Sequence, residues 1–323
     1  MSKVCAVVVT YNRPELLLEN IHALILQEFK LQTILIVDNY SNRDTLVKLQ
    51  DGGYINHFSD NFVKFGGEIK SRVTNKQGEE IEFIILRLST NTGGSGGFNQ
   101  GIRYFYEKTT DDLAWVMDDD TIPHNDSLNK LEYSYELLKS HGHNVGFVCS
   151  RVLEQNLSLG YPPVFYTGNE LMKYYLLKDD LLRIQNGPFL SALFTRNFVK
   201  ICGLPIKDFF IWLDDIEYTG RMKDVFDNAI CLSSVVIHKR GVVVDEHKIS
   251  QKNFFKFQNG FRNKMFLMSE DTSIFKIPKM IRQIVIDWRT IKSSDITFTN
   301  KIKLLKSLLV GSFFFRPKRE YFK

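Results

Sequence analysis

The sequence predicts an α/β fold with a mostly parallel central sheet flanked by helices, followed by a helical and basic extension. Short runs rich in valine, isoleucine and leucine recur along the chain, and such runs are typical of strands buried on both faces. The first two expected strands, at 3–10 and 33–37, are separated by a segment at 15–27 with apolar residues at helical spacing. A strand, a helix and a strand with short connections imply a parallel pair joined by a right-handed crossover.

The later elements are expected from the same two patterns. Residues 51–80 are polar, contain glycine and have no clear period, so a loop or a small hairpin is expected there. After residue 249 the pattern is helical and basic. The other expected elements are strands at 83–88, 113–117, 145–150, 188–195 and 230–237, and helices from the glycine-rich segment to about 107, at about 125–140 and at 196–201.

Length and composition bound the fold and its surroundings. With 323 residues and 44% hydrophobic content, the chain can bury one large core or two smaller ones. No apolar run reaches the roughly 18 residues that span a bilayer, and the N-terminus runs directly into a strand rather than a secretory leader. The cysteines, Cys5, Cys149, Cys202 and Cys231, form no CxxC pair, which argues against a disulfide framework or a zinc site. We therefore expect a reduced, cytoplasmic protein.

The charge is distributed unevenly along the chain. The net charge is +5, but residues 276–323 hold twelve Lys and Arg against three Asp and Glu. We expect a first domain at 1–245 and a helical basic region at 246–323. Within this region, residues 301–320 mix apolar runs with cations. This segment either lies in a membrane interface or docks on the first domain with a solvated basic rim.

Three consecutive carboxylates, Asp118, Asp119 and Asp120, follow the expected strand at 113–117. Adjacent carboxylates repel one another and lose hydration on burial unless a cation lies among them. Hard divalent cations prefer carboxylate oxygens, and a cation that also binds a diphosphate needs only one or two protein carboxylates. The alternative is that Asp120 or Thr121 caps a helix whose first turn holds Pro123. The motif alone leaves both interpretations open.

Polar residues follow the ends of the first two strands. Thr10 and Asn12 follow one, and Asp38 and Asn39 follow the other, at the edge where open sheets bind ligands. Turn chemistry alone also accounts for such residues. The segment 91–99, Asn-Thr-Gly-Gly-Ser-Gly-Gly-Phe-Asn, lies between a strand and a helix, where glycines let backbone N–H groups approach a phosphate or a sugar. The alternative is a flexible loop.

A second acidic pair, Asp214 and Asp215, follows Trp212 and two phenylalanines, where a helix is expected to begin. A carboxylate among aromatic side chains acquires a raised pKa, which suits a general base, whereas helix capping is the alternative. The last expected strand ends at His238. A single histidine in such a place is more often structural than a ligand, so its role stays open on the residues alone.

Six motifs therefore occur in a fixed order along the chain. They are Val-Val-Thr-Tyr-Asn-Arg at 8–13, Val-Asp-Asn at 37–39, Asn-Thr-Gly-Gly-Ser-Gly-Gly-Phe at 91–98, Met-Asp-Asp-Asp-Thr-Ile-Pro at 117–123, Trp-Leu-Asp-Asp at 212–215, and His238. This order resembles glycosyltransferase family 2 and, within it, the bacterial galactofuranosyltransferases, over about residues 3–240. The resemblance implies a GT-A nucleotide-sugar-binding fold, a UDP-sugar donor, Mn²⁺ or Mg²⁺, and an inverting mechanism. Rhamnosyltransferases of the family are similar but typically carry Asp-Gln-Asp at the metal site.

The resemblance also implies a donor site at the carboxyl ends of the strands. Asp118 and Asp120 would hold Mn²⁺ or Mg²⁺, with His238 as the third ligand. Asp38 would bind the uracil or the ribose of the donor. The other residues that would line the nucleotide pocket, or approach the sugar and the diphosphate, are Thr10, Asn12, Arg13, Asn91, Gly93, Gly94, Gly97 and Asp119.

On the acceptor side, the resemblance makes Asp215 the base that deprotonates the acceptor hydroxyl, with Asp214 as its rival for that role. Trp212 would form part of the acceptor platform, because an aromatic face suits the apolar side of a sugar ring. Intact carboxylates at these positions argue against a sugar-nucleotide-binding module without activity, since such a module has no use for a base.

The expected function is that of an inverting, metal-dependent transferase. It would move galactofuranose from UDP-galactofuranose onto a lipid-linked saccharide in bacterial cell-surface polysaccharide synthesis. The alternatives are a transferase of the same family that uses dTDP-rhamnose or another UDP-hexose, and a non-catalytic binding module. The basic C-terminus would contact the inner face of the cytoplasmic membrane peripherally, and no nucleic acid partner is expected.

Overall fold

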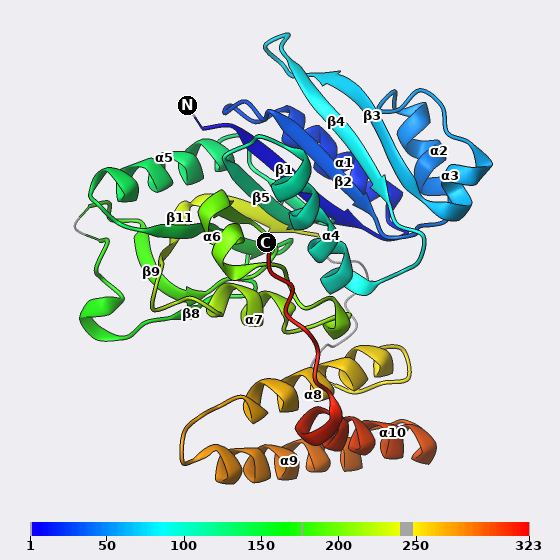
Figure 1. The fold of residues 1–323 in the computed structure, drawn as a ribbon, viewed down its shortest axis with the longest axis vertical. Helices are drawn as coiled ribbons and strands as arrows, with labels where there is room; N and C mark the ends of the chain where they lie inside the picture. The colour runs from blue at the N-terminus through cyan, green and yellow to red at the C-terminus, as the bar shows by residue number, and fades with distance from the viewer. Residues whose placement is uncertain (1, 176, 240–247, 323) are drawn as a thin grey trace.

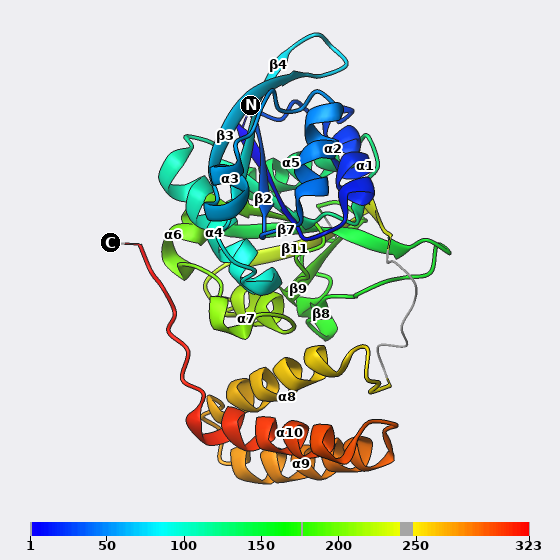
Figure 2. The same ribbon diagram turned by 90° about the vertical axis from the view of Figure 1, so that its right-hand side faces the viewer.

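The computed structural model describes residues 2–175, 177–239 and 248–322 (Figure 1). A part that contains the sheet lies above three helices, α8 (Phe254–Ser269), α9 (Lys276–Ser293) and α10 (Phe298–Leu309). The boundary expected between 245 and 246 lies outside the described residues. After α10 the chain makes a π-helical turn, η3 (Val310–Phe314), and returns along the upper part (Figure 2).

Within the described ranges, the strands form one eleven-stranded sheet in the order β3-β4-β2-β1-β5-β10-β7-β11-β9-β8, with β6 paired to β11. Neighbours are parallel from β4 to β5 and between β7 and β11, and the other pairs are antiparallel. Among the described strands the sheet is therefore mixed, with four parallel and six antiparallel pairs, and not mostly parallel as expected. The strands are β1 (Val4–Thr10), β2 (Thr33–Asp38), β3 (Gly67–Thr74), β4 (Glu80–Arg87), β5 (Leu113–Asp118), β6 (Thr121–Pro123), β7 (Val145–Glu154), β8 (Val164–Phe165), β9 (Leu181–Asn186), β10 (Ala192–Thr195) and β11 (Asp227–His238).

Helices cover both faces of this sheet, as the figures show. Alternate residues of β1 enter different cores, because successive side chains of a strand point to opposite faces. Val8 packs in one core with Leu17 of α1, and Val7 packs in the other with Phe98 of α4. The helices and short helical turns of this part are α1 (Pro14–Ile25), α2 (Arg43–Asp51), α3 (Asp60–Phe65), α4 (Gly93–Lys108), α5 (Ser127–Ser140), η1 (Gly168–Glu170), α6 (Arg196–Cys202), η2 (Lys207–Phe209) and α7 (Asp214–Gly220).

The register of the parallel strands sets the position of the site. Thr10 at the end of β1 lies opposite Asp38 at the end of β2, and Val9 lies opposite Asp118 at the end of β5. The polar residues that follow these strands therefore meet at one edge of the sheet.

Three local expectations differ, wholly or in part, from the structure. Residues 51–80, expected to be a loop or a small hairpin, contain the helix α3 and the edge strand β3, which forms a hairpin with β4. Glu68, Lys70 and Arg72 alternate along β3, but only Ile69 and Val73 are apolar between them, so the hydrophobic pattern of a strand is weak there. The glycine-rich segment, expected to be a binding loop, forms the first turns of α4 from Gly93 onward. The expected strand at 188–195 is shorter, since β10 begins at Ala192.

Candidate active site

A cleft of about 1160 Å³ lies where the carboxyl ends of the parallel strands face the segment before α7 and the helix α8. The expected site residues that line it are Thr10, Arg13, Asn91, Gly93, Gly94, Asp118, Asp119, Asp120, Trp212, Asp214, Asp215 and His238. One side, called here the triplet wall, consists of Thr10, Arg13, Asp118, Asp119, Asp120 and His238. The other side, called the turn wall, is the segment from Phe210 to Asp215.

Asp38, expected to bind the uracil or the ribose, is fully buried and is not one of the described residues that line the cleft. One carboxylate oxygen forms an ion pair with Arg87 on β4, and the other accepts the backbone N–H of Ser41 at 2.9 Å. Both oxygens are engaged inside the protein, so Asp38 shapes the turn after β2. Its neighbour Asn39 lines the cleft instead, and the Asn39 amide donates to the carbonyl of Gly93 at 2.9 Å.

Asn12 and Gly97 are not among the described residues that line the cleft, and both have close contacts inside the protein. The side-chain oxygen of Asn12 accepts a hydrogen bond from the backbone N–H of Asn42 at 2.7 Å, and the backbone N–H of Asn12 donates to Ser41 Oγ at 2.9 Å. A Cβ added at Gly97 would lie 2.5 Å from Cγ1 of Val9, so this glycine lets α4 pack closely on β1. The sequence could not separate a packing glycine from a binding glycine.

In the triplet wall, Asp119 is turned toward the loop after β1. It accepts a hydrogen bond from Thr10 Oγ1 at 2.7 Å and forms an ion pair with Arg13 at 3.3 Å. Asp120 also forms an ion pair with Arg13 through Oδ2. Its Oδ1 faces Nε2 of His238 at 3.4 Å and accepts no hydrogen bond from the described residues. Asp118 is partly exposed to the cleft.

The three carboxylates differ in their electrostatic surroundings. Burial, reinforced by the charges of Asp120 and Asp119, raises the pKa of Asp118 well above its usual range. Burial also raises the pKa of Asp119 to about 6, although Arg13 opposes it. Burial acts on Asp120 too, but His238 and Arg13 outweigh it and lower its pKa. The three carboxyls of the triplet wall therefore face one guanidinium, that of Arg13, which cannot neutralise all of them. A site for a further cation is expected to have such an excess of negative charge.

The residues of the triplet wall suit a divalent metal ion in their chemistry. Carboxylate oxygens of Asp118 and Asp120 and an imidazole nitrogen of His238 are accepted ligands of Mn²⁺ and Mg²⁺ sites. The buried Asp120 Oδ1, which faces His238, is the atom best placed to become such a ligand. Across the described ranges, no three His, Cys, Asp or Glu side chains are already gathered as a metal site. Side chains of the triplet wall would therefore have to move to hold a metal ion.

The turn wall has a strained backbone. Phe210, Trp212 and Leu213 have φ angles of 65°, 67° and 70°, in the left-handed region that disfavours side chains of this size. Such residues cost of the order of 1–3 kcal/mol each and persist only where the surroundings hold them. The strain presents Trp212 and the start of α7 to the cleft, so that Asp214 and Asp215 form its first turn.

Two elements far away in the sequence hold this turn. The Asn263 amide of α8 donates to the carbonyls of Phe209, Ile211 and Trp212 at 3.0, 3.1 and 3.0 Å. A glycine at the start of α4 completes the support, because a Cβ added at Gly93 would lie 2.0 Å from the carbonyl oxygen of Phe210. Gly93 has a φ of 71° and is therefore required both by its conformation and by the turn that it contacts.

The two carboxyls of the turn wall have raised pKa values. Burial, followed by the charge of Asp215, raises the pKa of Asp214 to about 7. Burial raises the pKa of Asp215 to about 6, partly offset by the backbone N–H of Ile216, which donates to Asp215 Oδ1 at 2.7 Å. A carboxyl that titrates near neutral pH is a better proton acceptor than an ordinary aspartate.

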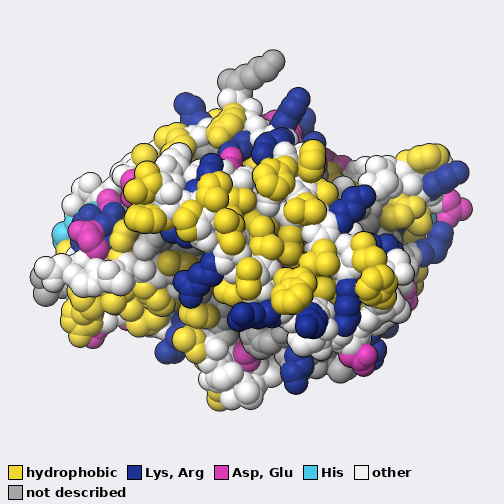
Figure 3. All heavy atoms as spheres, turned by 90° about the horizontal axis from the view of Figure 1, so that it is seen from below, with side chains coloured by type: hydrophobic (Ala, Val, Ile, Leu, Met, Phe, Trp, Pro, Cys, Tyr) yellow, Lys and Arg dark blue, Asp and Glu magenta, His cyan; other side chains and the backbone are white. Residues whose placement is uncertain are grey.

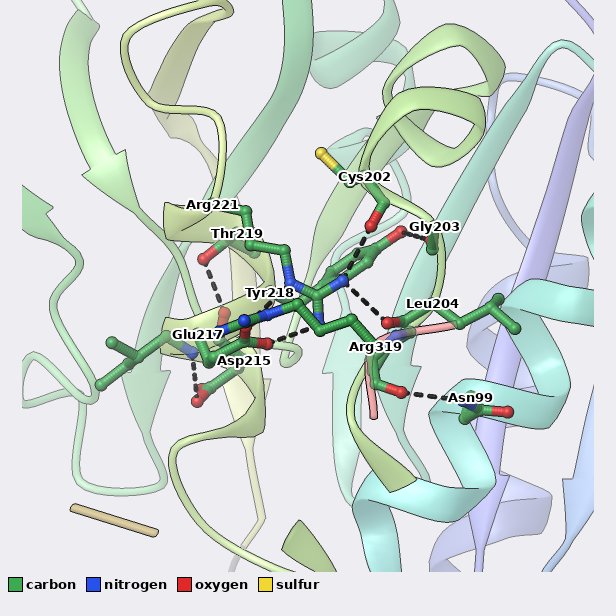
Figure 4. A network of polar contacts seen from close by, with 12 residues as sticks. Asn99, Cys202, Gly203, Leu204, Asp215, Glu217, Tyr218, Thr219, Arg221 and Arg319 are labelled. Carbon is green, nitrogen blue, oxygen red and sulfur yellow. Dashed lines mark hydrogen bonds and ion pairs between the residues drawn. The ribbon is translucent and has the colours of Figure 1, made fainter. Parts of the chain in front are cut away.

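The helix α7 is anchored behind the cleft by a buried network (Figure 4). Glu217 forms an ion pair with Arg221 at 2.6 Å and with Arg319 of the returning C-terminal segment at 2.8 Å. Arg221 also donates to the carbonyls of Cys202 and Leu204 at 2.7 and 2.9 Å. The end of the chain thus fixes the helix that carries the acidic pair.

The third side of the cleft, which α8 and the residues just before it supply, was not expected from the sequence. Phe255, Phe257 and Lys256 line the cleft there, and Lys252 precedes them. A Cβ added at Gly260 would lie 2.5 Å from Trp212, so this glycine makes room for the indole. The aromatic run from 254 to 257 was the available signal, but it is equally typical of a helix core.

Comparisons with known proteins concern the sequence and the fold of the chain. The family model described as glycosyl transferase family 2 matches residues 5–57. Galactofuranosyltransferase GlfT1 of Mycolicibacterium smegmatis is 26% identical over 289 residues, which are 83% of this chain and 83% of that protein. A solved structure of GalNAc-T7 with UDP, GalNAc and Mn²⁺ superposes with a TM-score of 0.54 at 12% identity. The superposition covers 80% of this chain and 48% of the GalNAc-T7 chain.

The chain is a glycosyltransferase with a GT-A fold. It resembles family 2 and is similar to a galactofuranosyltransferase at modest identity. A solved structure of residues 1–349 of TarS from S. aureus has a TM-score of 0.49 at 13% identity, over 96% of this glycosyltransferase and 72% of that chain.

Proposed function

We propose that this glycosyltransferase moves galactofuranose from UDP-galactofuranose onto a saccharide acceptor, with inversion at the anomeric carbon. The observation that carries the proposal is that a carboxylate-rich wall and a second acidic pair with raised pKa values face the same cleft. The similarity to a galactofuranosyltransferase over 83% of the chain supports the choice of sugar.

On the donor side, the triplet wall would receive the diphosphate. Asp118, Asp120 and His238 would hold Mn²⁺ or Mg²⁺, which when bound neutralises the charge that develops on the departing UDP. Thr10 and Arg13 keep Asp119 away from this set by binding its carboxylate. Asn91 and Gly94 line the same side of the cleft, close to where the nucleotide and the sugar would lie.

On the acceptor side, Asp215 would accept the proton of the attacking hydroxyl. The hydroxyl oxygen forms a bond to the anomeric carbon while the bond between that carbon and the UDP oxygen breaks, and its electron pair leaves with UDP. Asp214, which is more buried and influences the pKa of Asp118, is the alternative base. Trp212 would carry the acceptor ring on its indole face, which Gly260 leaves room for.

The acceptor in this proposal is a lipid-linked saccharide of a bacterial cell-surface polysaccharide. Residues 1–245 would supply the metal ligands and the candidate bases, and α8 would complete the cleft as its third side. Residues 246–323 would also bring the enzyme to the inner face of the cytoplasmic membrane as a peripheral protein. No described helix has the length and apolar character needed to cross a bilayer.

The test is a measurement of nucleotide release with a panel of donors. The purified enzyme, with Mn²⁺, is incubated separately with UDP-galactofuranose, UDP-galactopyranose, UDP-glucose and dTDP-rhamnose. We expect slow release of UDP from UDP-galactofuranose, and none above background in Asp215→Asn. Faster release from dTDP-rhamnose or another UDP-hexose would contradict the choice of sugar. No release from any donor would favour a binding module without activity.

A further inference from the structure

The helix α9 has two apolar faces, although only one of them packs on the protein. Met280 and Ile291 are buried against α8 and α10 in a separate core. A second stripe points outward at the spacing of one helix face, and Ile281 within it is 57% exposed. The outward residues of this stripe, including one just before the helix, are Ile274, Ile277, Ile281, Val285 and Trp288.

The neighbouring helix α10 repeats this arrangement. Leu304 and Leu308 are buried, whereas Ile302 is 49% and Phe298 is 77% exposed. The outward apolar residues of α10 and of the turn that follows it are Phe298, Ile302, Leu309, Phe313 and Phe314. Seen from below, these side chains gather into a broad apolar area over the lower helices (Figure 3). The outward apolar residues of α9, α10 and η3 are called here the lower face.

Cations surround the lower face. Residues 276–309 contain eight Lys and Arg against two Asp. One of the two, Asp287, is buried and forms an ion pair with Lys264 of α8 at 2.8 Å, so it adds no negative charge to the surface. Figure 3 shows Lys and Arg side chains at the rim of the apolar area and between its parts.

An apolar face with a cationic rim is complementary to a bilayer with anionic headgroups. Helices of this kind lie in the plane of the interface, with apolar side chains among the acyl chains and with Lys and Arg at the phosphates. A protein partner would also cover apolar side chains, but it would not explain a rim of one sign around two adjacent helices. The tryptophan and the phenylalanines of the lower face also suit the headgroup region.

The last residues of the chain are engaged elsewhere. Arg319 forms ion pairs with Glu217 and Glu270, and Glu320 forms one with Arg103. The ring of Phe322 lies 3.9 Å from that of Tyr106, between centroids. The C-terminal basic segment is therefore partly bound to the enzyme, and α9 and α10 carry the surface that remains outward.

We propose that the lower face rests in the interface of an anionic bilayer and holds the enzyme there. This inference deepens the membrane contact of the proposed function and rests on that part of it alone. The ion pair between Lys264 and Asp287 joins α9 to α8, and α8 lines the cleft. A saccharide on a lipid anchor would therefore approach the cleft from the side of α8.

The test is co-sedimentation of the full chain with vesicles of phosphatidylcholine containing phosphatidylglycerol, at low salt and without substrates. The double variant Ile281→Ser/Ile302→Ser should lower the partition coefficient by about tenfold or more, because each substitution removes the free energy gained when an isoleucine side chain moves from water into the bilayer. The variant Arg282→Gln/Lys306→Gln should weaken binding to anionic vesicles and reduce its sensitivity to salt. The matched control is Phe65→Ser/Leu157→Ser, which removes two apolar side chains of the upper part that are more exposed than Ile281 and Ile302, and this variant should bind normally.

Three outcomes would overturn the proposal. The first is unchanged vesicle binding in Ile281→Ser/Ile302→Ser. The second is a loss of binding in Arg316→Gln/Lys318→Gln as large as that in the isoleucine variant, which would assign the contact to the C-terminal segment. The third is a dimer in sedimentation velocity, without vesicles, that the isoleucine variant abolishes. Nucleotide release with a soluble acceptor reports on the proposed function separately and should stay normal in all of these variants.

Discussion

The two walls of the cleft are built in different ways. The triplet wall comes from strand ends that the sheet register places together, and its main contacts lie within residues 10–120, with His238 added from β11. The turn wall is a short strained segment before α7 that depends on the amide of Asn263, about 50 residues later. The position of the triplet wall therefore depends on the register of the sheet, whereas the conformation of the turn wall depends on contacts with α8.

This difference predicts a division of labour. The triplet wall should determine metal-dependent binding of the nucleotide, because the carboxylates and His238 lie there. The turn wall should determine turnover, because it positions the carboxyls with pKa values near neutral. Changes in one wall should leave the property of the other nearly intact.

The largest expected effect is that of removing the metal. Chelation should abolish transfer, and Mn²⁺ or Mg²⁺ should restore it, because the diphosphate leaves poorly without a neutralising cation. Asp120→Ala and His238→Ala should lose metal-dependent UDP binding as well. The matched control is Asp60→Ala, an exposed aspartate far from the cleft that forms an ion pair with Arg43. Normal turnover of the chelated enzyme would contradict the assignment of Asp118, Asp120 and His238.

The second effect distinguishes the two candidate bases. Asp215→Asn should lower kcat by about 10²–10⁴-fold, the usual contribution of a general base, while UDP affinity stays unchanged. Asp214→Asn should have the milder effect on kcat. Single-turnover rates and UDP affinities of both variants give the comparison. A reversed order of the two rates would make Asp214 the base.

The third effect is a pH dependence. The raised pKa values, about 7 for Asp214 and about 6 for Asp215, mean that these carboxyls become protonated as the pH falls through this range. A protonated carboxyl cannot accept the hydroxyl proton, so kcat should be constant above about pH 7.5 and fall up to about tenfold per unit below about pH 6. An ordinary aspartate would give the fall near pH 4. A profile of kcat that stays flat down to pH 5 would argue against both carboxyls as the base.

The smallest expected effect concerns the support of the turn wall. Asn263→Ala removes the donor of three carbonyls, and about 1 kcal/mol is typical for each buried hydrogen bond that is lost. We expect a fall of about tenfold in kcat through poorer placement of Asp215, together with a loss of stability of about 2–3 kcal/mol. Asn259→Ala is the matched control, because that amide donates to Phe255 of its own helix at 2.9 Å. Equal effects of both variants on kcat would show that α8 acts only through its own stability.

Several parts of the site were predictable from the sequence because their signals are local. The valine-rich strand before Thr10 and the apolar run before Asp118 specify buried strands, and their ends must meet at one edge once the strands are parallel. The fold class and the nature of the enzyme are confirmed by the comparisons. The placement of Asp214 and Asp215 at the start of a helix is seen in the structure as well.

Other parts were not predictable because they depend on contacts between distant residues. Asp38 ends a strand, where a ligand-binding residue is expected, but its carboxylate forms an ion pair with Arg87 of the neighbouring strand β4. Gly97 reads like a binding glycine, and only the proximity of Val9 shows that it serves packing. Nothing local marks Asn263 as the support of a turn that precedes it by about 50 residues.

The central claim, that the two walls do separate work, is tested most directly by calorimetric titration of UDP in the presence of Mn²⁺. The titration compares the wild type with Asp120→Ala and Asn263→Ala. We predict that Asp120→Ala loses most of its metal-dependent affinity for UDP, while Asn263→Ala binds UDP as the wild type does although its kcat is reduced. If Asn263→Ala loses UDP affinity as strongly as Asp120→Ala does, the cleft works as a single unit and the division between its walls is wrong.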